Sequence, residues 1–277
     1  MKWLYLVGNT SDTVVPKLFS TSYGEDEQSI PLTWSVRTNT EFQKCGARGI
    51  SLLFASGDSG ASGDNGCGKD DHGNAIFVPQ WPSGSPYVTA VGGAAGGSAT
   101  TAETVAGLSS GGFSNRWKRP KWQQAATSNY LKNASGNLPS KIHFNSTGRG
   151  FPDIAAEAVD FVIVQFGLPL PGVSGKKKNR KIYLFCYNYS FSLARTFFLT
   201  LIISTPGTSC ASPTAAGIFG LLNDLRASSN KTSLGFLNPF IYQHSNAFND
   251  IVKGMLCLFL FLQHEYSSTC SDLSPSN

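Results

Sequence analysis

A serine in a glycine-led turn is the strongest chemical signal in the sequence. It lies in the heptapeptide Gly207-Thr208-Ser209-Cys210-Ala211-Ser212-Pro213, in which small residues follow the serine and a helix is expected to begin at once. Serine hydrolases present a nucleophile in this way, because a helix N-terminus favours the negative charge that develops during attack. The same residues could cap a helix, with Ser209 or Ser212 as the N-cap and Pro213 at the first helical position. Both interpretations can hold together, and Ser209 is a candidate nucleophile.

A second candidate is an aspartate that follows an apolar run. Residues 50–55 are apolar enough to form a strand that is buried on both faces, and Ser56, Gly57 and Asp58 come directly after it. Because open parallel sheets place their sites at the carboxyl ends of strands, Asp58 is expected to project into a crevice. The alternative is a glycine-rich turn with a solvated aspartate.

The elements that must position these residues follow an alternating pattern. Apolar runs at residues 50–55, 87–91 and 161–166 are typical of buried strands, and residues 32–47 and 212–226 carry helical patterns. Strands that alternate with helices predict an α/β protein with a mostly parallel sheet.

Several collinear stretches, both candidate motifs among them, resemble the sedolisins, the serine-carboxyl peptidases. Outside the two motifs, the matching stretches are residues 19–27, 82–93, 111–115, 151–156 and 234–239. The resemblance covers most of residues 3–254. It implies a subtilisin-like, mostly parallel sheet flanked by helices, here incomplete at the N-terminus and at the C-terminus. It also implies an acid serine peptidase that removes tripeptides from the free N-termini of peptides and proteins.

The resemblance assigns roles to individual residues. It makes Ser209 the nucleophile and Asp58 the residue that stabilises the oxyanion. A carboxylate cannot stabilise an alkoxide, whereas a carboxylic acid can donate a hydrogen bond to it, so Asp58 is expected to be protonated in the working enzyme. This requirement predicts activity in acid. The substrate-binding residues implied by the resemblance are Ser110, Gly111, Gly112 and Tyr23, the first three pairing with the substrate backbone as an added strand.

A calcium ion and a disulfide are also implied by the resemblance. The first calcium ligands would be the carboxylate of Asp250 and the backbone carbonyl of Ile251, and oxygen ligands suit this hard cation. The rest of the ligand set is incomplete, because the sequence stops matching the family after Gly254. Cys67 and Cys257 lie near the positions where the family forms a disulfide.

The sequence departs from the family pattern in three places. An insert occupies about residues 176–207, and residues 255–277 form a non-matching tail. The expected organisation is therefore a partial peptidase domain over residues 1–254, interrupted by the insert. The family's general base is a glutamate with an orienting aspartate four residues later, and no such pair precedes Asp58. The alternative to an active peptidase is an inactive fragment or a membrane-tethered, non-enzymatic relative anchored by residues 181–203.

Other enzyme and binding classes are disfavoured. An ordinary subtilisin needs a histidine base, and none of the four histidines lies in a His-Gly-Thr-His type of motif. Arg195 interrupts the apolar segment 181–203, so a membrane span is not expected. The net charge of +5 includes a basic run at residues 176–181 without a basic, aromatic-rich face, and nucleic-acid binding is not expected.

Composition and sequons bear on the folded state and the compartment. Hydrophobic residues make up 41% of the 277 residues and charged residues 14%, which excludes wholesale disorder. Sites of the N-x-S/T type favour the secretory route or the lysosome, and they begin at Asn9, Asn133, Asn145, Asn188 and Asn230.

Overall fold

The structure is a computed structural model that describes residues 2–64, 66–97, 102–159, 161, 163–165, 168–170 and 207–252. Apart from Gly207, the expected insert at 176–207 lies outside the described residues, and so do the apolar segment 181–203 and the tail 255–277. The boundaries of the expected partial peptidase domain, residues 1–254, therefore stay a prediction.

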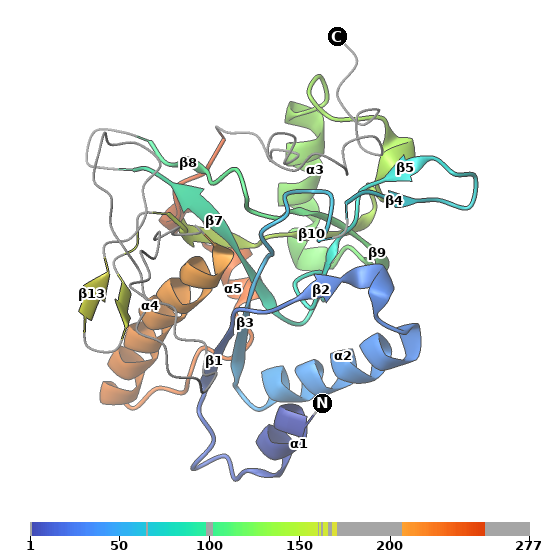
Figure 1. The fold of residues 1–277 in the computed structure, drawn as a ribbon. Coiled ribbons are helices and arrows are strands. Elements are labelled where there is room, and N and C mark those ends of the chain that lie inside the picture. Colours follow the sequence, from blue (N-terminus) through green and yellow to red (C-terminus); the bar gives the residue numbers. More distant parts are fainter. Residues whose placement is uncertain are drawn as a thin grey trace, which may run out of the picture.

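One sheet forms the centre of the fold. Its strands lie in the order β1, β3, β7 and β11, and all three pairings are parallel. The short β8 (Thr104–Val105) adds an antiparallel pair to β7. The mostly parallel sheet that the sequence predicts is thus confirmed (Figure 1), with the strand bounds Leu18–Thr21, Ser51–Ala55, Thr89–Ala95 and Ile154–Glu157.

Helices cover both faces of this sheet because β3 is apolar on both sides. Side chains alternate between the two faces of a strand. Leu53 packs with α4 (Thr208–Ser228) in one buried cluster. Leu52 and Phe54 pack with α2 (Leu32–Ala47) in the other. Figure 1 shows β1 and β3 between α4 and α2. The helix α1 (Lys2–Asn9) adds Leu4 and Val7 to the second cluster.

The helix α4 begins earlier than its apolar pattern predicts. Gly207 is its N-cap, so the expectation that Ser209 or Ser212 caps the helix is wrong. Pro213 lies inside the helix instead of at its first position. A proline lacks the N–H that would bond to the carbonyl four residues earlier, which is that of Ser209. The hydroxyl of Ser22 donates to this carbonyl at 3.0 Å, so the proline leaves no unpaired group there.

Within the predicted strand at 161–166, the described residues 163–165 lie outside the central sheet, which corrects the sequence prediction. β12 (Ile163–Gln165) pairs antiparallel with β13 (Leu168–Leu170). The neighbour of β7 is instead β11, whose sequence Ile-Ala-Ala-Glu is too short and too small-sided to show an apolar run. Glycine permits the close approach on this side, since a Cβ placed on Gly92 would lie 2.6 Å from Pro152.

The remaining elements form small ribbons and helices around the sheet. Three antiparallel ribbons pair β2 with β6, β4 with β5 and β9 with β10. In chain order the strands span Glu25–Asp26, Gly68–Lys69, Ala75–Ile76, Gln80–Trp81, Gly112–Lys118 and Gly148–Phe151. Two helices, α3 and α5, and four 3-10 turns complete the described chain, at Gln124–Asn133, Asn238–Gln243, Glu27–Ser29, Lys121–Gln123, Lys141–His143 and Ser245–Ala247.

A buried ion pair ties three of these elements together. The guanidinium of Arg149 on β10 contacts the carboxylate of Asp153, and both side chains are fully buried. Asp153 also accepts hydrogen bonds from Ala90 N on β7 (2.8 Å) and from two groups of α5, Tyr242 Oη (3.0 Å) and Asn238 Nδ2 (3.3 Å). Burial raises the pKa of the Asp153 carboxyl, and the Arg149 charge opposes that rise. The network fixes how β7, β10 and α5 meet.

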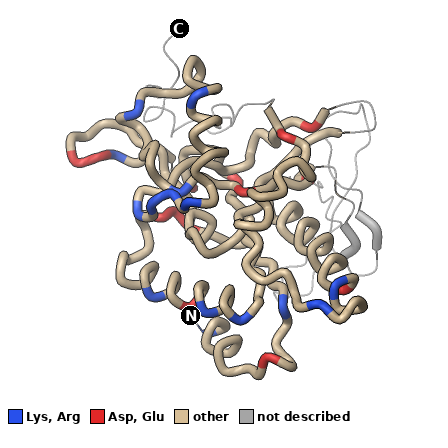
Figure 2. Tube along the Cα trace, turned by 180° about the vertical axis from the view of Figure 1, so that it is seen from behind, with Lys and Arg blue, Asp and Glu red and all other residues tan. Residues whose placement is uncertain are grey.

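Charged and apolar groups are distributed differently over the surface. Lys and Arg occupy several separate segments of the described chain, with Asp and Glu between them (Figure 2). One helix, α4, instead exposes a row of apolar side chains: Ile218, Leu221 and Leu225 are 56%, 69% and 65% exposed. No helix in the described part of the chain is long and apolar enough to cross a bilayer.

Candidate active site

Asp58 and the turn before Ser209 meet at one edge of the central sheet. Asp58 follows the carboxyl end of β3, as the sequence predicts. Its Oδ1 accepts hydrogen bonds from the backbone N–H of Thr208 (2.7 Å) and from the hydroxyl of the same residue (2.8 Å). Both Asp58 and Ser209 are exposed to solvent. Residues that are 150 positions apart in the sequence are thereby brought into direct contact.

The two carboxyl oxygens of Asp58 have different surroundings. Oδ1 is held by Thr208, whereas Oδ2 accepts no hydrogen bond from any described residue. Oδ2 lies toward Gly207, since a Cβ on that residue would be 3.1 Å away. The geometry therefore leaves one oxygen free to carry a proton and to donate it in a hydrogen bond, which is the chemistry expected of an oxyanion residue.

Ser209 lies in the first turn of α4, next to two contacts with β1 and the turn after it. In the first contact, the hydroxyl of Ser22 donates a hydrogen bond to the carbonyl of Ser209. In the second, the hydroxyl of Ser20 on β1 lies 3.0 Å from the hydroxyl of Ser212 on α4. The N-terminal end of the helix carries partial positive charge, which stabilises an oxyanion formed nearby. The backbone of Ser209 is thus held at the positively charged end of α4.

Cys210 is the other nucleophilic group next to Asp58. Burial raises the pKa of its thiol, and the negative charge of Asp58 raises it further. Because the thiolate is the reactive form of cysteine, this environment disfavours Cys210 as the nucleophile.

Ser110 lies behind the loop that carries Asp58 instead of lining open space. It is buried, its hydroxyl accepts a hydrogen bond from Ser59 N (3.0 Å), and its N–H donates to Gly57 O (2.8 Å). Gly57 has a positive φ of 111°, and a Cβ there would lie 2.8 Å from Ser110 Oγ, so only glycine fits. The N–H of Ser110 is engaged, so the backbone contact with substrate that the resemblance implies would have to use its carbonyl.

The other residues expected to bind substrate surround the same site. Gly111 is buried and Gly112 is half-buried at the start of β9. Tyr23 is 73% exposed and follows Ser22, the residue bonded to the carbonyl of Ser209. These residues are chain neighbours of Ser110, which contacts the Asp58 loop, and of Ser22, which contacts the Ser209 turn, and their roles in substrate binding stay predictions.

Asp250 and Ile251, the expected calcium ligands, follow the last 3-10 turn. Asp250 is exposed and Ile251 is half-buried. Their carboxylate and carbonyl are of the oxygen type that calcium prefers, but two donors fall short of the about six to eight that it takes. Within the described residues, no three acidic, histidine or cysteine side chains gather in a way that could hold a metal ion.

The cysteines in the described part of the chain are found in two states. Cys67 is disulfide-bonded, whereas Cys45 and Cys210 are free thiols. Cys257, the partner position suggested by the family resemblance, lies outside the described residues.

Three residues at the site carry no clear signal in the sequence. Thr208 directly precedes Ser209 in the heptapeptide. This adjacency is the one sequence signal that could have identified Thr208 as a site residue. Asp26 and Glu27 lie in an acidic cluster that is typical of a solvated turn, yet both side chains are buried. Burial of two adjacent acids depends on tertiary contacts that local patterns do not report.

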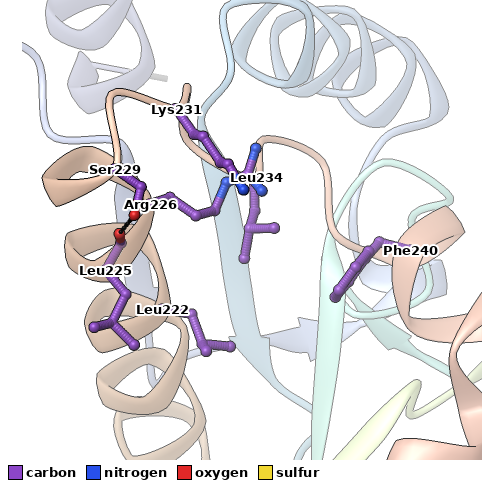
Figure 3. Close-up of a pocket in the computed structure, with 7 residues that line it drawn as sticks. All are labelled: Leu222, Leu225, Arg226, Ser229, Lys231, Leu234 and Phe240. Atoms are coloured by element: carbon purple, nitrogen blue, oxygen red, sulfur yellow. Dashed lines mark hydrogen bonds between the residues drawn. The ribbon is translucent and has the colours of Figure 1, made fainter.

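A cavity of about 330 Å³ lies at the far end of α4 and is separate from this site (Figure 3). At 1.5 Å of rise per residue, its nearest helical residue, Leu222, is about 20 Å along the axis from Ser209. Figure 3 shows a mainly aliphatic lining with two cations, formed by Leu222, Leu225, Arg226, Ser229, Lys231, Leu234 and Phe240.

Comparison with known proteins finds peptidases. Tripeptidyl-peptidase 1 from Mus musculus is 37% identical over 257 residues, which cover 92% of this chain and 39% of the mouse protein. The Homo sapiens protein of the same name is also 37% identical over 257 residues and is covered to 38% of its length. The chain is a relative of the sedolisins. A Pseudomonas sedolisin, a serine-carboxyl proteinase solved with two molecules of pseudo-iodotyrostatin, superposes with a TM-score of 0.57. This match has 23% identity and covers 88% of this chain and 55% of the sedolisin chain.

The relationship to the sedolisins confirms the family resemblance and the subtilisin-like fold. A psychrophilic protease superposes with a TM-score of 0.50 at 15% identity, covering 91% of this chain and 56% of its own, which supports the fold alone. No family model matches the chain. This sedolisin relative spans about two fifths of the length of the curated proteins it matches. The tripeptidyl-peptidases and the sedolisin are peptidases by name, which agrees with the expected class of serine-carboxyl peptidases.

Proposed function

We propose that this chain carries the nucleophile and the oxyanion residue of an acid serine-carboxyl peptidase, which removes tripeptides from the free N-termini of peptides and proteins. The observation that supports the proposal most directly is the pair of hydrogen bonds from Thr208 to Asp58 Oδ1, 2.7 and 2.8 Å long. It sets an acid with one unoccupied oxygen beside the serine of a helix N-terminus.

The proposed reaction begins with attack by Ser209. Its Oγ forms a bond to the carbonyl carbon of the scissile peptide, and the carbonyl electron pair moves onto the oxygen. The protonated Oδ2 of Asp58 donates a hydrogen bond to this oxyanion. The serine proton passes to a carboxylate base, which is not among the residues assigned in this chain, and then to the leaving amine, which departs as the C–N bond breaks. Water hydrolyses the resulting ester and restores Ser209.

This division of roles implies activity in acid. The oxyanion residue works only when it is protonated, so the rate falls as pH rises. The base works only when it is ionised, so the rate also falls at the acid extreme. The requirement for acid pH fits a protein that enters the secretory route and works in an acidic compartment such as the lysosome. The sequons at the exposed Asn9, Asn133 and Asn230 make a glycoprotein part of the same proposal.

The test is hydrolysis of an Ala-Ala-Phe reporter from pH 3 to pH 8 by the 277-residue chain and by the full-length product of its gene. We expect Ser209→Ala to lose nearly all of the rate. The matched control is Ser228→Ala, which changes an exposed serine at the other end of α4 and should keep the rate. Equal rates for Ser209→Ala and the unchanged protein would remove the nucleophile assignment.

A calcium ion held in part by Asp250 and Ile251 belongs to the same proposal. The support is the oxygen type of both donors and the exposure of Asp250. When bound, the ion would crosslink the end of the described chain to the donors that complete its shell, and so stabilise the fold.

A further inference from the structure

Two adjacent acids stand behind the proposed site without facing it. Asp26, at the end of β2, is buried, and Glu27, in the turn that follows, is 1% exposed. Burying an acid is costly unless hydrogen bonds compensate. The question is which groups those hydrogen bonds hold.

Asp26 holds the loop that carries Asp58. Its Oδ1 accepts hydrogen bonds from Asp64 N (2.9 Å) and from Gln80 Nε2 (2.8 Å). Asp64 in turn accepts from the hydroxyl of Ser59 at 2.7 Å, and Ser59 is the neighbour of Asp58. A continuous series of hydrogen bonds therefore connects Asp26 to the residue beside the proposed oxyanion group.

The loop is pressed closely against this acid. Gly63 has a φ of 75°, and a Cβ there would lie 2.6 Å from Asp26 Oδ1, so no larger residue could follow the same path. On the other side of the loop, a Cβ on Gly57 would lie 3.0 Å from the side chain of Gln80. Asp26 and Gln80 thus contact the loop both before and after Asp58.

Glu27 holds a different wall of the site, the start of β9. Its carboxylate accepts hydrogen bonds from the hydroxyl of Ser114 and from Asn115 N, the latter at 2.8 Å. The same hydroxyl accepts from Arg116 N (3.1 Å) and Trp117 N (2.9 Å). Glu27 therefore fixes the backbone two and three residues after Gly112, the glycine expected to contact substrate.

We infer that Asp26 and Glu27 are positioning residues for the two walls of the active site, Asp26 for the loop with Asp58 and Glu27 for the substrate strand at the start of β9. The inference rests on the proposed function for its catalytic consequence. The two acids do not touch the reacting atoms and act through Asp64, Ser59 and Ser114. Because their partners differ, their loss has different kinetic effects.

Substitution of Asp26 should affect the chemical step. A displaced oxyanion residue weakens the transition state more than the bound substrate, so Asp26→Ala should lower kcat by about 10- to 100-fold and change KM by less than about threefold. Asp26→Asn keeps an oxygen that can accept both hydrogen bonds and should retain more of kcat. Gln80→Leu, which removes one donor to Asp26, should move kcat in the same direction and replaces Asp26→Ala if that variant does not fold.

Substitution of Glu27 should affect substrate binding instead. Glu27→Gln loses one of the two acceptors and loosens the start of β9, so KM should rise about tenfold with kcat changed by less than about threefold. The matched acid-to-amide control is Asp71→Asn in the exposed β4–β5 turn, which should change neither parameter. Equal effects of the Asp26 and Glu27 variants on both parameters would overturn the inference.

Amide hydrogen exchange of the substrate-free chain tests the same inference without activity. Asp26→Ala should speed exchange in residues 57–64 and leave 112–118 unchanged, and Glu27→Gln should do the reverse. Faster exchange in both segments, or in neither, contradicts the separate roles. If exchange separates as expected while Ser209→Ala and the unchanged protein hydrolyse the reporter equally, the proposed function fails and the positioning of the two segments stands.

Discussion

Thr208 is the residue on which the arrangement of the site depends. Its N–H and hydroxyl both bond to Asp58 Oδ1, and its hydroxyl is also 3.2 Å from the carbonyl of Gly57. A single side chain thus joins the turn before Ser209 to the loop after β3. Hydrogen bonds to a carboxyl group are among the stronger ones in proteins, which suits this role.

Replacement of the Thr208 hydroxyl by a methyl group should therefore impair the chemical step. Thr208→Val keeps the shape and the N–H but removes the 2.8 Å hydrogen bond to Asp58. We expect kcat to fall by about tenfold, which corresponds to about 1.4 kcal/mol. Thr208→Ser should restore most of the rate. Steady-state kinetics with the tripeptide reporter measures the effect, and Thr232→Val in an exposed loop serves as the control. An unchanged kcat in Thr208→Val would show that the hydroxyl has no catalytic role.

Glu27 should make the folded chain more stable in acid. Burial raises the pKa of its carboxyl, so the unfolded chain loses this proton at lower pH than the folded chain does. Stability is therefore lost as pH rises from about 4.3, the ordinary value for glutamate, through the raised folded pKa. The free energy of unfolding of the unchanged chain, relative to Glu27→Gln, should fall as pH rises above about 4.3.

Glu41 provides the opposite case as a control. Its hydrogen bond from Lys44, and then the contact with Arg37, lower the pKa of Glu41. Its contribution to stability is present above the unfolded pKa and is lost as pH falls through the folded pKa. Urea titrations at several pH values should thus give opposite trends for Glu27→Gln and Glu41→Gln, and parallel trends would contradict the burial argument.

Calcium removal should act on the end of the described chain if the proposed site exists. We expect added calcium to raise the melting temperature of the full-length product and chelation to lower it. Asp250→Asn should abolish most of this response, because it removes the one carboxylate assigned to the ion. A melting temperature that does not respond to calcium would remove the site from the proposal.

At the scale of elements, parallel strands and the buried ion pair decide where the loops meet. The parallel pairings of β1, β3 and β7 place their carboxyl ends at one edge, from which the Ser22 and Asp58 turns emerge. Arg149 and Asp153 fix β10 and α5 against β7. They do so at the edge of β7 that faces away from β3. The site therefore depends on packing that lies outside it.

Removing one partner of this ion pair should destabilise the fold strongly. Arg149→Met leaves the fully buried Asp153 carboxylate without its cation, and a loss of about 3–5 kcal/mol in the free energy of unfolding is expected. Adding Asp153→Asn to this variant should recover part of the loss, since no uncompensated charge then remains. Chemical denaturation of the two single variants and the double variant measures the coupling. Additive losses would show that the pair does not act as a unit.

At the scale of the whole molecule, α4 is the helix with two different surroundings. One side packs on the central sheet through Ala211, Ala215 and Phe219, and the other exposes the apolar row of Ile218, Leu221 and Leu225. Contiguous exposed apolar surface favours association. The cavity beside Leu222 and Phe240 extends this surface (Figure 3).

The exposed row should make the isolated 277-residue chain prone to self-association. Leu221→Gln combined with Leu225→Gln should lower light scattering and the binding of a hydrophobic dye, with little change in unfolding free energy, because both side chains are largely exposed. The contrasting control is Leu237→Gln in the buried core, which should unfold the chain. Unchanged scattering in the double variant would show that this row does not drive association.

Local patterns were sufficient for the strands and helices with strong apolar signals. The run at 50–55 corresponds to β3, the pattern at 32–47 to α2, and the parallel sheet follows from their alternation. The sequence pattern did not predict β11, because the segment Ile-Ala-Ala-Glu has few large apolar side chains. Close packing near Gly92 holds this strand in the sheet instead. Periodicity reports burial of large side chains, and it is silent where small residues create the contact.

The sequence by itself predicted the candidate chemistry of this protein from a serine at the start of a helix, an aspartate after a buried strand, and the order of motifs shared with the sedolisins. Only the tertiary structure decided that Thr208 joins Asp58 to the Ser209 turn, and that Ser110 lies behind the loop. It also decided that Asp26 and Glu27, polar residues in a turn-like segment, are buried. The reason is physical, since hydrogen bonds between residues 38 to 150 positions apart depend on how strands and helices pack, and no local pattern encodes that distance.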